Sequence, residues 1–85
     1  MTGNPGNRGV RRVATPEQLG QALADLRRAA GMNQQELAEW AGVSRQYLSV
    51  LETGDVSLQV RRLLDLLAVL GHDLAVVPRA GLEEG

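Results

Sequence analysis

The stretch NQQELAEWAGVSRQYLSVLETG, residues 33–54, decides the fold of this chain. Asn33, with Glu36 three residues later, forms a capping-box pattern that predicts the start of a helix. Apolar residues follow at helical spacing until Gly42, a residue that readily adopts the left-handed conformation of a helix end. Ser44 then provides the N-cap of a second helix. Two short helices with so tight a connection predict a helix-turn-helix.

Two further helices are predicted, one on each side of this pair. Thr15 followed by Pro16 predicts the start of the first, which ends at Gly31. Ser57 caps the last, LQVRRLLDLLAVL, which ends at Gly71. The apolar residues of this last helix spread over about 220°, whereas one packed face needs a stripe little more than about 100° wide. The excess predicts that the helix contacts a second surface besides the core of its own domain.

The hydrophobic period changes after that helix. The segment HDLAVVP, residues 72–78, alternates its side chains and predicts a strand. A lone apolar strand leaves backbone groups unpaired, so we expect it to pair with the same strand of a second copy across a two-fold axis. VRRVA, residues 10–14, is the alternative partner, although we expect disorder there, with a short extended piece or a basic arm that reaches DNA as alternatives. The predicted organisation is a flexible N-terminal arm, a helix-turn-helix domain, a dimerisation strand and a disordered tail, over residues 1–14, 15–71, 72–78 and 79–85.

Composition limits the classes of function that are possible for this chain. The chain has no Cys, which excludes a thiolate nucleophile or a Cys-based zinc site, and its only His is His72. We therefore expect no enzyme and no cofactor. No apolar run approaches the roughly 20 residues of a membrane span, and no signal-peptide pattern begins the chain, so we expect a cytoplasmic protein without a membrane partner. The net charge is −1, but residues 1–50 carry six Arg against four acids and residues 51–85 carry three against six.

The stretch that opens this section resembles the helix-turn-helix of the lambda-repressor-like, XRE-type transcription regulators. The resemblance spans about residues 18–71 and rests on Gln34, Glu36, Leu37, Ala38, Gly42, Val43, Ser44, Leu48, Ser49, Leu51, Glu52 and Gly54. It implies an all-α, four-helix domain that binds double-stranded DNA, here with a C-terminal strand that pairs across a dimer. It also implies that the second helix of the pair enters the major groove.

We expect four residues at the N-terminal end and outer face of that second helix to reach base edges. Arg45 can pair with guanine O6 and N7, and Gln46 can pair with adenine N6 and N7. Ser44 and Ser49 complete the set, although the hydroxyl of Ser44 is also needed as the cap. The alternative is an ordinary solvated helix face.

Four other residues are expected on the DNA backbone. The resemblance places the side chain of Gln34 on a phosphate, where the helix N-terminus adds backbone N–H groups and a favourable dipole. Gln35, Tyr47 and Thr53 are the further phosphate candidates. For the glutamines the alternative is solvation, and for Tyr47 it is packing of the ring on the helix surface.

Two positions have competing structural interpretations. Arg27 and Glu52 resemble an ion pair with which many family members tie the first helix to the end of the third. The competing view is that Arg27 is exposed and contacts phosphate. Trp40 is either at the edge of the core or a contact for a partner protein, since Trp is enriched at interface hot spots.

The order of helix, Leu-Gly step and strand in LLAVLGHDLAVVP, residues 66–78, is similar to that of HipB-like antitoxins. This narrower resemblance implies a homodimer that represses its own operon at a near-palindromic operator and binds a HipA-like kinase toxin. We expect the dimer interface to include Leu66, Val69, Leu74 and Val76. The alternatives are a stand-alone XRE repressor without a toxin and a protein-interaction module that has lost DNA binding.

Overall fold

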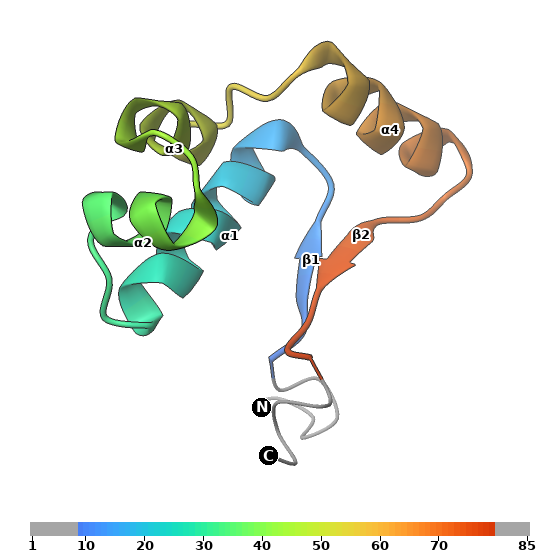
Figure 1. Ribbon diagram of the computed structural model, residues 1–85. Helices are drawn as coiled ribbons and strands as arrows, with labels where there is room; N and C mark the ends of the chain where they lie inside the picture. Colours follow the sequence, from blue (N-terminus) through green and yellow to red (C-terminus); the bar gives the residue numbers. More distant parts are fainter. Residues whose placement is uncertain (1–8, 80–85) are drawn as a thin grey trace.

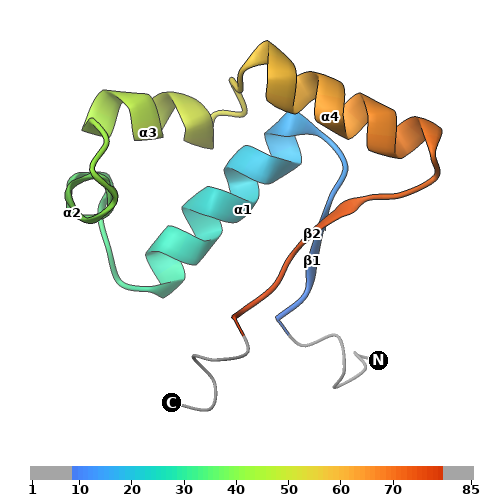
Figure 2. The same ribbon diagram turned by 45° about the vertical axis from the view of Figure 1, so that its right-hand side comes forward.

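The computed structural model describes residues 9–79 of the chain. Its elements are β1 (Arg11–Val13), α1 (Pro16–Ala29), α2 (Gln34–Ala41), α3 (Arg45–Glu52), α4 (Leu58–Val69) and β2 (Leu74–Val76). Helix α1 runs through the middle, with α2 and α3 on one side and α4 and the two strands on the other (Figure 1). In Figure 2, α2 is seen end-on while α3 lies across the view, so the two helices cross steeply, as in a helix-turn-helix.

Each helix begins where its capping residue predicts. The side chains of the four N-cap residues each accept a hydrogen bond from the backbone N–H three residues further on, at Thr15, Asn33, Ser44 and Ser57. The predicted capping box is present, because Glu36 also accepts from the backbone N–H of Asn33. Gly42 ends α2 with φ of +76°, in the left-handed region. Local hydrogen bonds therefore fix the boundaries of the helix pair.

Helices α1 and α3 meet backbone to backbone at two glycines. A Cβ atom on Gly20, in the middle of α1, would lie 2.6 Å from the carbonyl oxygen of Leu51. Gly54, just after α3, has φ of +93°, and a Cβ there would lie 2.8 Å from Cα of Glu17. Glycine in a helix interior normally costs stability relative to Ala. Its presence in α1 lets the C-terminal end of α3 approach closely, which sets the orientation of α3.

The two strands pair with each other within the chain. β1 and β2 are antiparallel, with Arg11 opposite Val76 and Val13 opposite Leu74. The expectation of a flexible arm over residues 1–14 is therefore wrong for residues 11–13, and the alternative partner segment VRRVA is the one that the structure uses. The physical reason is anchoring: Val13 is fully buried, and Nη1 of Arg11 lies 2.7 Å from Oδ2 of Asp25 on α1.

Pairing of β2 across a dimer would have to use the other edge of this strand, and it stays a prediction. Residues 1–8 of the predicted arm and residues 80–85 of the predicted tail lie outside the described part of the chain.

The hydrophobic core is small. In the described part of the chain, the buried apolar residues are Val13, Ala22, Ala24, Ala38, Leu48 and Leu64, and half of these are alanines. Helix α4 turns Leu64 inward, and its Val60 and Leu67 are half-buried. Between 48% and 85% exposed are Leu58, Leu63, Leu66 and Val69 on the helix and Leu70 at its C-cap. The second apolar face predicted for this helix is therefore present and uncovered.

Candidate nucleic-acid interface

Helix α3 presents a polar outer face over a buried anchor. Leu48 is 4% exposed and holds the helix against the core. Arg45 and Gln46, in the first turn, are exposed, as is Ser44 before them. Ser49 is only half-buried, so it is less available to a base than the other three expected base-edge residues. The structure thus places three polar side chains together at the N-terminal end of α3.

The two hydroxyl groups at the ends of α3 are used differently. Oγ of Ser44 accepts a hydrogen bond from the backbone N–H of Tyr47 at 3.0 Å, so its own O–H stays available to donate to DNA. Oγ1 of Thr53 instead donates to the backbone oxygen of Val50 at 2.6 Å. A phosphate only accepts hydrogen bonds, so Thr53 would have to give up this bond to hold one. The predicted phosphate role of Thr53 is therefore less well supported than its role at the end of the helix.

Gln34 connects the two helices of the pair. Its Nε2 donates to Oε1 of Glu52 at 2.9 Å, and its Oε1 accepts from Nη1 of Arg45 at 3.4 Å. One amide hydrogen of Gln34 remains for a phosphate. The first backbone N–H groups of α2 add to it, because a helix start leaves them without intrahelical partners. Gln35 is exposed, and its amide donates to Glu39 at 2.9 Å.

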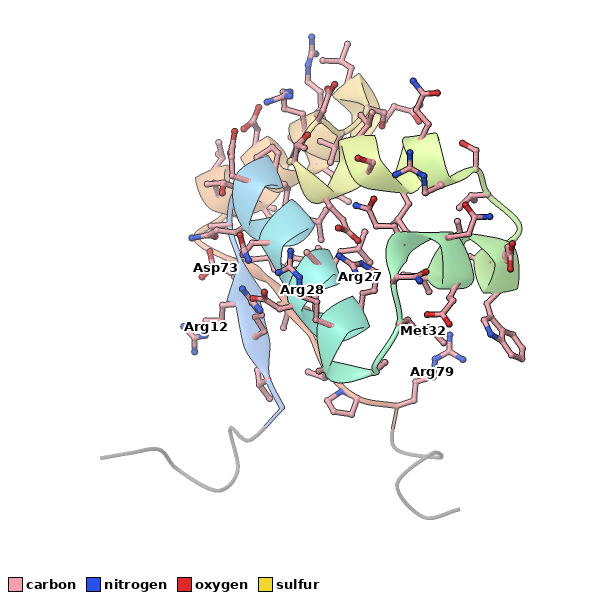
Figure 3. All side chains as sticks on the ribbon, turned by 90° about the vertical axis from the view of Figure 1, so that its left-hand side faces the viewer. Arg12, Arg27, Arg28, Met32, Asp73 and Arg79 are labelled. Carbon is pink, nitrogen blue, oxygen red and sulfur yellow. The ribbon has the colours of Figure 1, made fainter. Side chains whose placement is uncertain are left out.

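The ion pair between Arg27 and Glu52 is formed and nearly buried. Nε of Arg27 lies 2.7 Å from Oε2 of Glu52, and the two side chains are only 9% and 6% exposed. Nη2 of Arg27 donates to Oε1 of Glu52 at 3.1 Å, and its Nη1 donates to the carbonyl oxygen of Met32 at 2.8 Å. Figure 3 shows Arg27 between α1 and α2. The competing view of an exposed Arg27 on phosphate is therefore wrong.

This pairing shifts the pKa values of both Glu52 and Arg27. The hydrogen bonds from Arg27 are the largest cause that lowers the pKa of Glu52, and the bond from Gln34 lowers it further against the opposing effect of burial. The hydrogen bond to Glu52 raises the pKa of Arg27. Glu52 is therefore ionised at neutral pH, and its charge is neutralised by Arg27. At the C-terminal end of α3, Glu52 therefore does not act as a free negative charge that would repel DNA.

The two aromatic residues are both on the surface. Trp40 is 81% exposed, so the interpretation as a core-edge residue is wrong and the interpretation as a partner contact stays a prediction. Tyr47 is 55% exposed and lines a groove between α3 and the start of α4 with Val50 and Val60. Its side chain is accessible from solvent, and its contact with phosphate stays a prediction.

The expected dimer-interface residues divide into two groups. On α4, Leu66 is 62% and Val69 is 85% exposed. On β2, Leu74 and Val76 are half-buried, and Val76 lies against apolar residues of α1. A partner could reach the α4 residues directly, whereas the side chains of Leu74 and Val76 turn toward their own chain.

Sequence reasoning missed a second polar cluster, centred on Asp25. Its carboxylate accepts from Arg11 at 2.7 Å, from Gln21 at 2.9 Å and from Arg28 at 3.5 Å. The hydrogen bond from Arg11 is the largest cause that lowers the pKa of Asp25. The helical spacing of Gln21, Asp25 and Arg28 is a usable signal for the local contacts. The contact with Arg11 depends on β1, which sequence reasoning did not favour.

Among residues 9–79, no three His, Asp or Glu side chains gather in a way that could hold a metal ion. Each helix in the same range is too short or too polar to cross a bilayer.

Comparison with known proteins agrees with this geometry. Residues 18–80 match the model of a helix-turn-helix domain family. The chain is 30% identical over 68 residues to an uncharacterized HTH-type transcriptional regulator, y4mF, of Sinorhizobium fredii. The aligned region covers 80% of this chain and 90% of that protein. It is 36% identical over 56 residues to an uncharacterized HTH-type transcriptional regulator of Haemophilus influenzae, covering 66% of this chain and 57% of that one. No solved structure matches significantly.

The chain therefore belongs to the helix-turn-helix family of DNA-binding transcriptional regulators. Within that class, α2 and α3 are the helix pair, and α3 corresponds to the helix that enters the major groove.

Proposed function

We propose that this protein is a sequence-specific repressor that binds double-stranded DNA as a homodimer and controls the promoter of its own operon in the cytoplasm. The observation that carries the proposal is the exposed pair Arg45 and Gln46 at the start of α3, above the buried anchor Leu48. These two side chains offer the donor and acceptor patterns that distinguish guanine and adenine in the major groove.

The contacts of Arg45 favour recognition of a base over nonspecific electrostatic binding to the DNA backbone. Gln34 accepts a hydrogen bond from Arg45, and Glu52 in turn holds Gln34. At 3.4 Å the contact with Gln34 is long and exposed, and the other N–H groups of the guanidinium stay available to pair with a base. With a net charge of −1, the chain has no general attraction for DNA, so affinity has to come from local contacts of this kind.

The homodimer is supported by the exposed apolar face of α4. Leu66 and Val69 are 62% and 85% exposed, which is unusual for a small domain unless a partner covers them. A two-fold dimer implies a near-palindromic operator. Its half-sites are then expected about one helical turn, roughly 34–36 Å, or a multiple of that distance apart.

We further propose that the protein is an antitoxin of the HipB type, which also binds a HipA-like kinase toxin. Support comes from a short helix-turn-helix chain with a strand directly after its last helix, and from Trp40, whose 81% exposure suits a protein contact. A stand-alone regulator without a toxin is the second candidate. A kinase-like gene next to this one, and co-purification of its product with wild type but not with Trp40→Ala, are the outcomes that the antitoxin proposal expects.

The test of DNA reading is a binding titration. The wild-type protein is titrated at about 0.1 M salt against DNA from upstream of its own gene and against unrelated DNA. We expect affinity for the upstream DNA to be about 10³-fold or more higher. Arg45→Ala with Gln46→Ala should remove this preference, whereas Gln59→Ala, an exposed glutamine on α4, should leave it unchanged.

Equal, weak binding to both DNAs would contradict control of its own promoter. Together with full biological function of the Arg45→Ala, Gln46→Ala protein, it would favour a protein-interaction module that has lost DNA binding.

A further inference from the structure

One side chain of α2 contacts both ends of α3. Arg45 is the first residue of α3 and Glu52 is the last, and they lie about two helical turns apart on the same side of that helix. Gln34, the first residue of α2, donates from Nε2 to Oε1 of Glu52 at 2.9 Å. Its Oε1 accepts from Nη1 of Arg45 at 3.4 Å. The start and the end of α3 are therefore joined through a single amide group.

Glu52 fixes the direction of these hydrogen bonds. It is ionised at neutral pH, because the hydrogen bonds from Arg27 lower its pKa, and both side chains of this pair are nearly buried. An ionised carboxylate can only accept hydrogen bonds, whereas an amide offers donors at one end and an acceptor at the other. Gln34 therefore turns its Nε2 to Glu52, which leaves its Oε1 for Arg45. The charge on Glu52 determines which atom of Gln34 faces Arg45.

The contact between Gln34 and Arg45 affects direction more than strength. At 3.4 Å the bond is long, and it uses only one of the five N–H groups of the guanidinium. A bidentate contact with a guanine requires the plane of the guanidinium to match the base edge. One hydrogen bond to a fixed acceptor limits how this plane can turn and leaves the other N–H groups free for the base.

We propose that Glu52 is a positioning residue for DNA recognition, which acts through Gln34 to set the direction in which Arg45 presents its guanidinium to a base. The inference rests on the proposed reading of DNA by Arg45. It gives the ion pair of Arg27 with Glu52 a role in base specificity in addition to its role in stability. The second amide hydrogen of Gln34 stays available for a phosphate.

Two substitutions release Arg45 in different ways. In Glu52→Gln, the side-chain oxygen would face the donor groups of Arg27, and the new amide would face Gln34. Gln34 would then turn its Oε1 to this amide and its Nε2 to Arg45, where a donor meets a donor. Gln34→Met removes the acceptor for Arg45 directly and leaves the ion pair in place. Both changes leave Arg45 without an acceptor, although only the first alters the ion pair.

The first test needs no DNA. The heteronuclear NOE of the Nε–H group of Arg45 reports its motion on the picosecond to nanosecond timescale, and Arg62, an exposed arginine of α4, is the reference. We expect Arg45 to be more restricted than Arg62 in the wild type and as mobile as Arg62 in both variants. Circular dichroism checks that each variant is folded, and Gln34→Met decides the result if Glu52→Gln is not. A wild-type Arg45 as mobile as Arg62, or one that stays restricted in a folded variant, would overturn the proposal.

The second test measures base discrimination on the DNA upstream of the gene and on the set of its single-base-pair variants. Arg45→Ala first identifies the base pair that Arg45 reads. At this base pair, Gln34→Met and Glu52→Gln should each reduce the ratio of affinities for the correct and a wrong base pair by about three- to tenfold. The ratios at the other base pairs should change by no more than about twofold. The double variant should lose no more than either single variant, because Glu52 acts through Gln34.

A ratio of affinities does not depend on the fraction of protein that is folded, so a purely structural role of Glu52 would leave it unchanged. Equal losses of affinity for all of these DNAs would mean a structural or phosphate role only and would overturn the proposal. Gln59→Met and Glu39→Gln make matched changes at exposed positions and should leave the ratios unchanged. A wild type without any preferred DNA would contradict the proposed function instead, and the restricted Arg45 of the first test would still distinguish that failure from failure of this inference.

Discussion

Replacement of Glu52 by Gln tests the network that fixes α3. The carboxylate of Glu52 accepts two hydrogen bonds from Arg27, at 2.7 and 3.1 Å, and one from Gln34 at 2.9 Å. A glutamine has nearly the same shape but only one acceptor oxygen, and its amide would face donor groups. Arg27 would also lose its counter-charge at a site where its side chain is 9% exposed.

The expected loss of folding free energy is about 2–4 kcal/mol. Hydrogen bonds to charged groups contribute about 1.5–3 kcal/mol each, and removing one partner of a buried ion pair costs about 3–5 kcal/mol. We take the lower part of this range because the amide retains part of the bonding. For a domain of this size, such a loss lowers the melting temperature by about 8–30 °C.

The assay is thermal and urea unfolding at several pH values, followed by circular dichroism. Because the folded-state pKa of Glu52 is lowered below its ordinary value of 4.5, its contribution is fully present above that pH. The contribution is lost as the pH falls through the folded-state pKa. The difference in stability between wild type and Glu52→Gln should therefore be largest near neutral pH and shrink in acid.

Glu39→Gln is the matched control, since it makes the same change at an exposed carboxylate that accepts a bond from Gln35. It should alter the free energy of unfolding by no more than about 0.5 kcal/mol. If Glu52→Gln behaved like this control at neutral pH, or if its destabilisation were independent of pH, the reasoning about the network would be refuted.

Three further changes have defined outcomes. Gly20→Ala should destabilise the fold by about 1–3 kcal/mol in urea unfolding. The new Cβ would lie 2.6 Å from the carbonyl oxygen of Leu51, and this clash outweighs the better helix propensity of Ala. A gain in stability would contradict the close approach of α1 and α3. Arg45→Lys should keep the fold but reduce discrimination between the correct and a wrong base pair at one position by about 1–3 kcal/mol in competition binding, since Lys lacks the bidentate geometry. Unchanged discrimination would show that Arg45 touches only phosphate. Leu66→Asp should yield a monomer whose melting temperature no longer depends on protein concentration, and a persistent dimer would exclude α4 from the interface.

The helices could be predicted because their signals are local. Each begins with a capping side chain whose acceptor lies three residues from its donor, and Gly42 ends α2 in the left-handed region. The ion pair of Arg27 with Glu52 was also expected, but from resemblance to a family. Nothing in the spacing of those two residues alone indicates the contact.

Contacts between distant segments were harder to predict. β1 and β2 pair although most of the sequence lies between them, and a strand as short as Arg11–Val13 has almost no periodic signal. The anchors of β1, Val13 and the Arg11–Asp25 pair, exist only once the strand lies on α1. Trp40 was misplaced for a similar reason, because helical spacing leaves the edge of a face ambiguous when the neighbouring helix is unknown.

Selection of binding sites from random duplex DNA by the wild-type protein tests the central claim most directly. Specific reading by α3 in a two-fold dimer predicts enrichment of an inverted repeat whose half-sites are about 10–10.5 base pairs apart, or a multiple of that spacing. Recovery of sequences with no common motif, at an affinity equal to that of the starting pool, would contradict sequence-specific DNA binding by this protein.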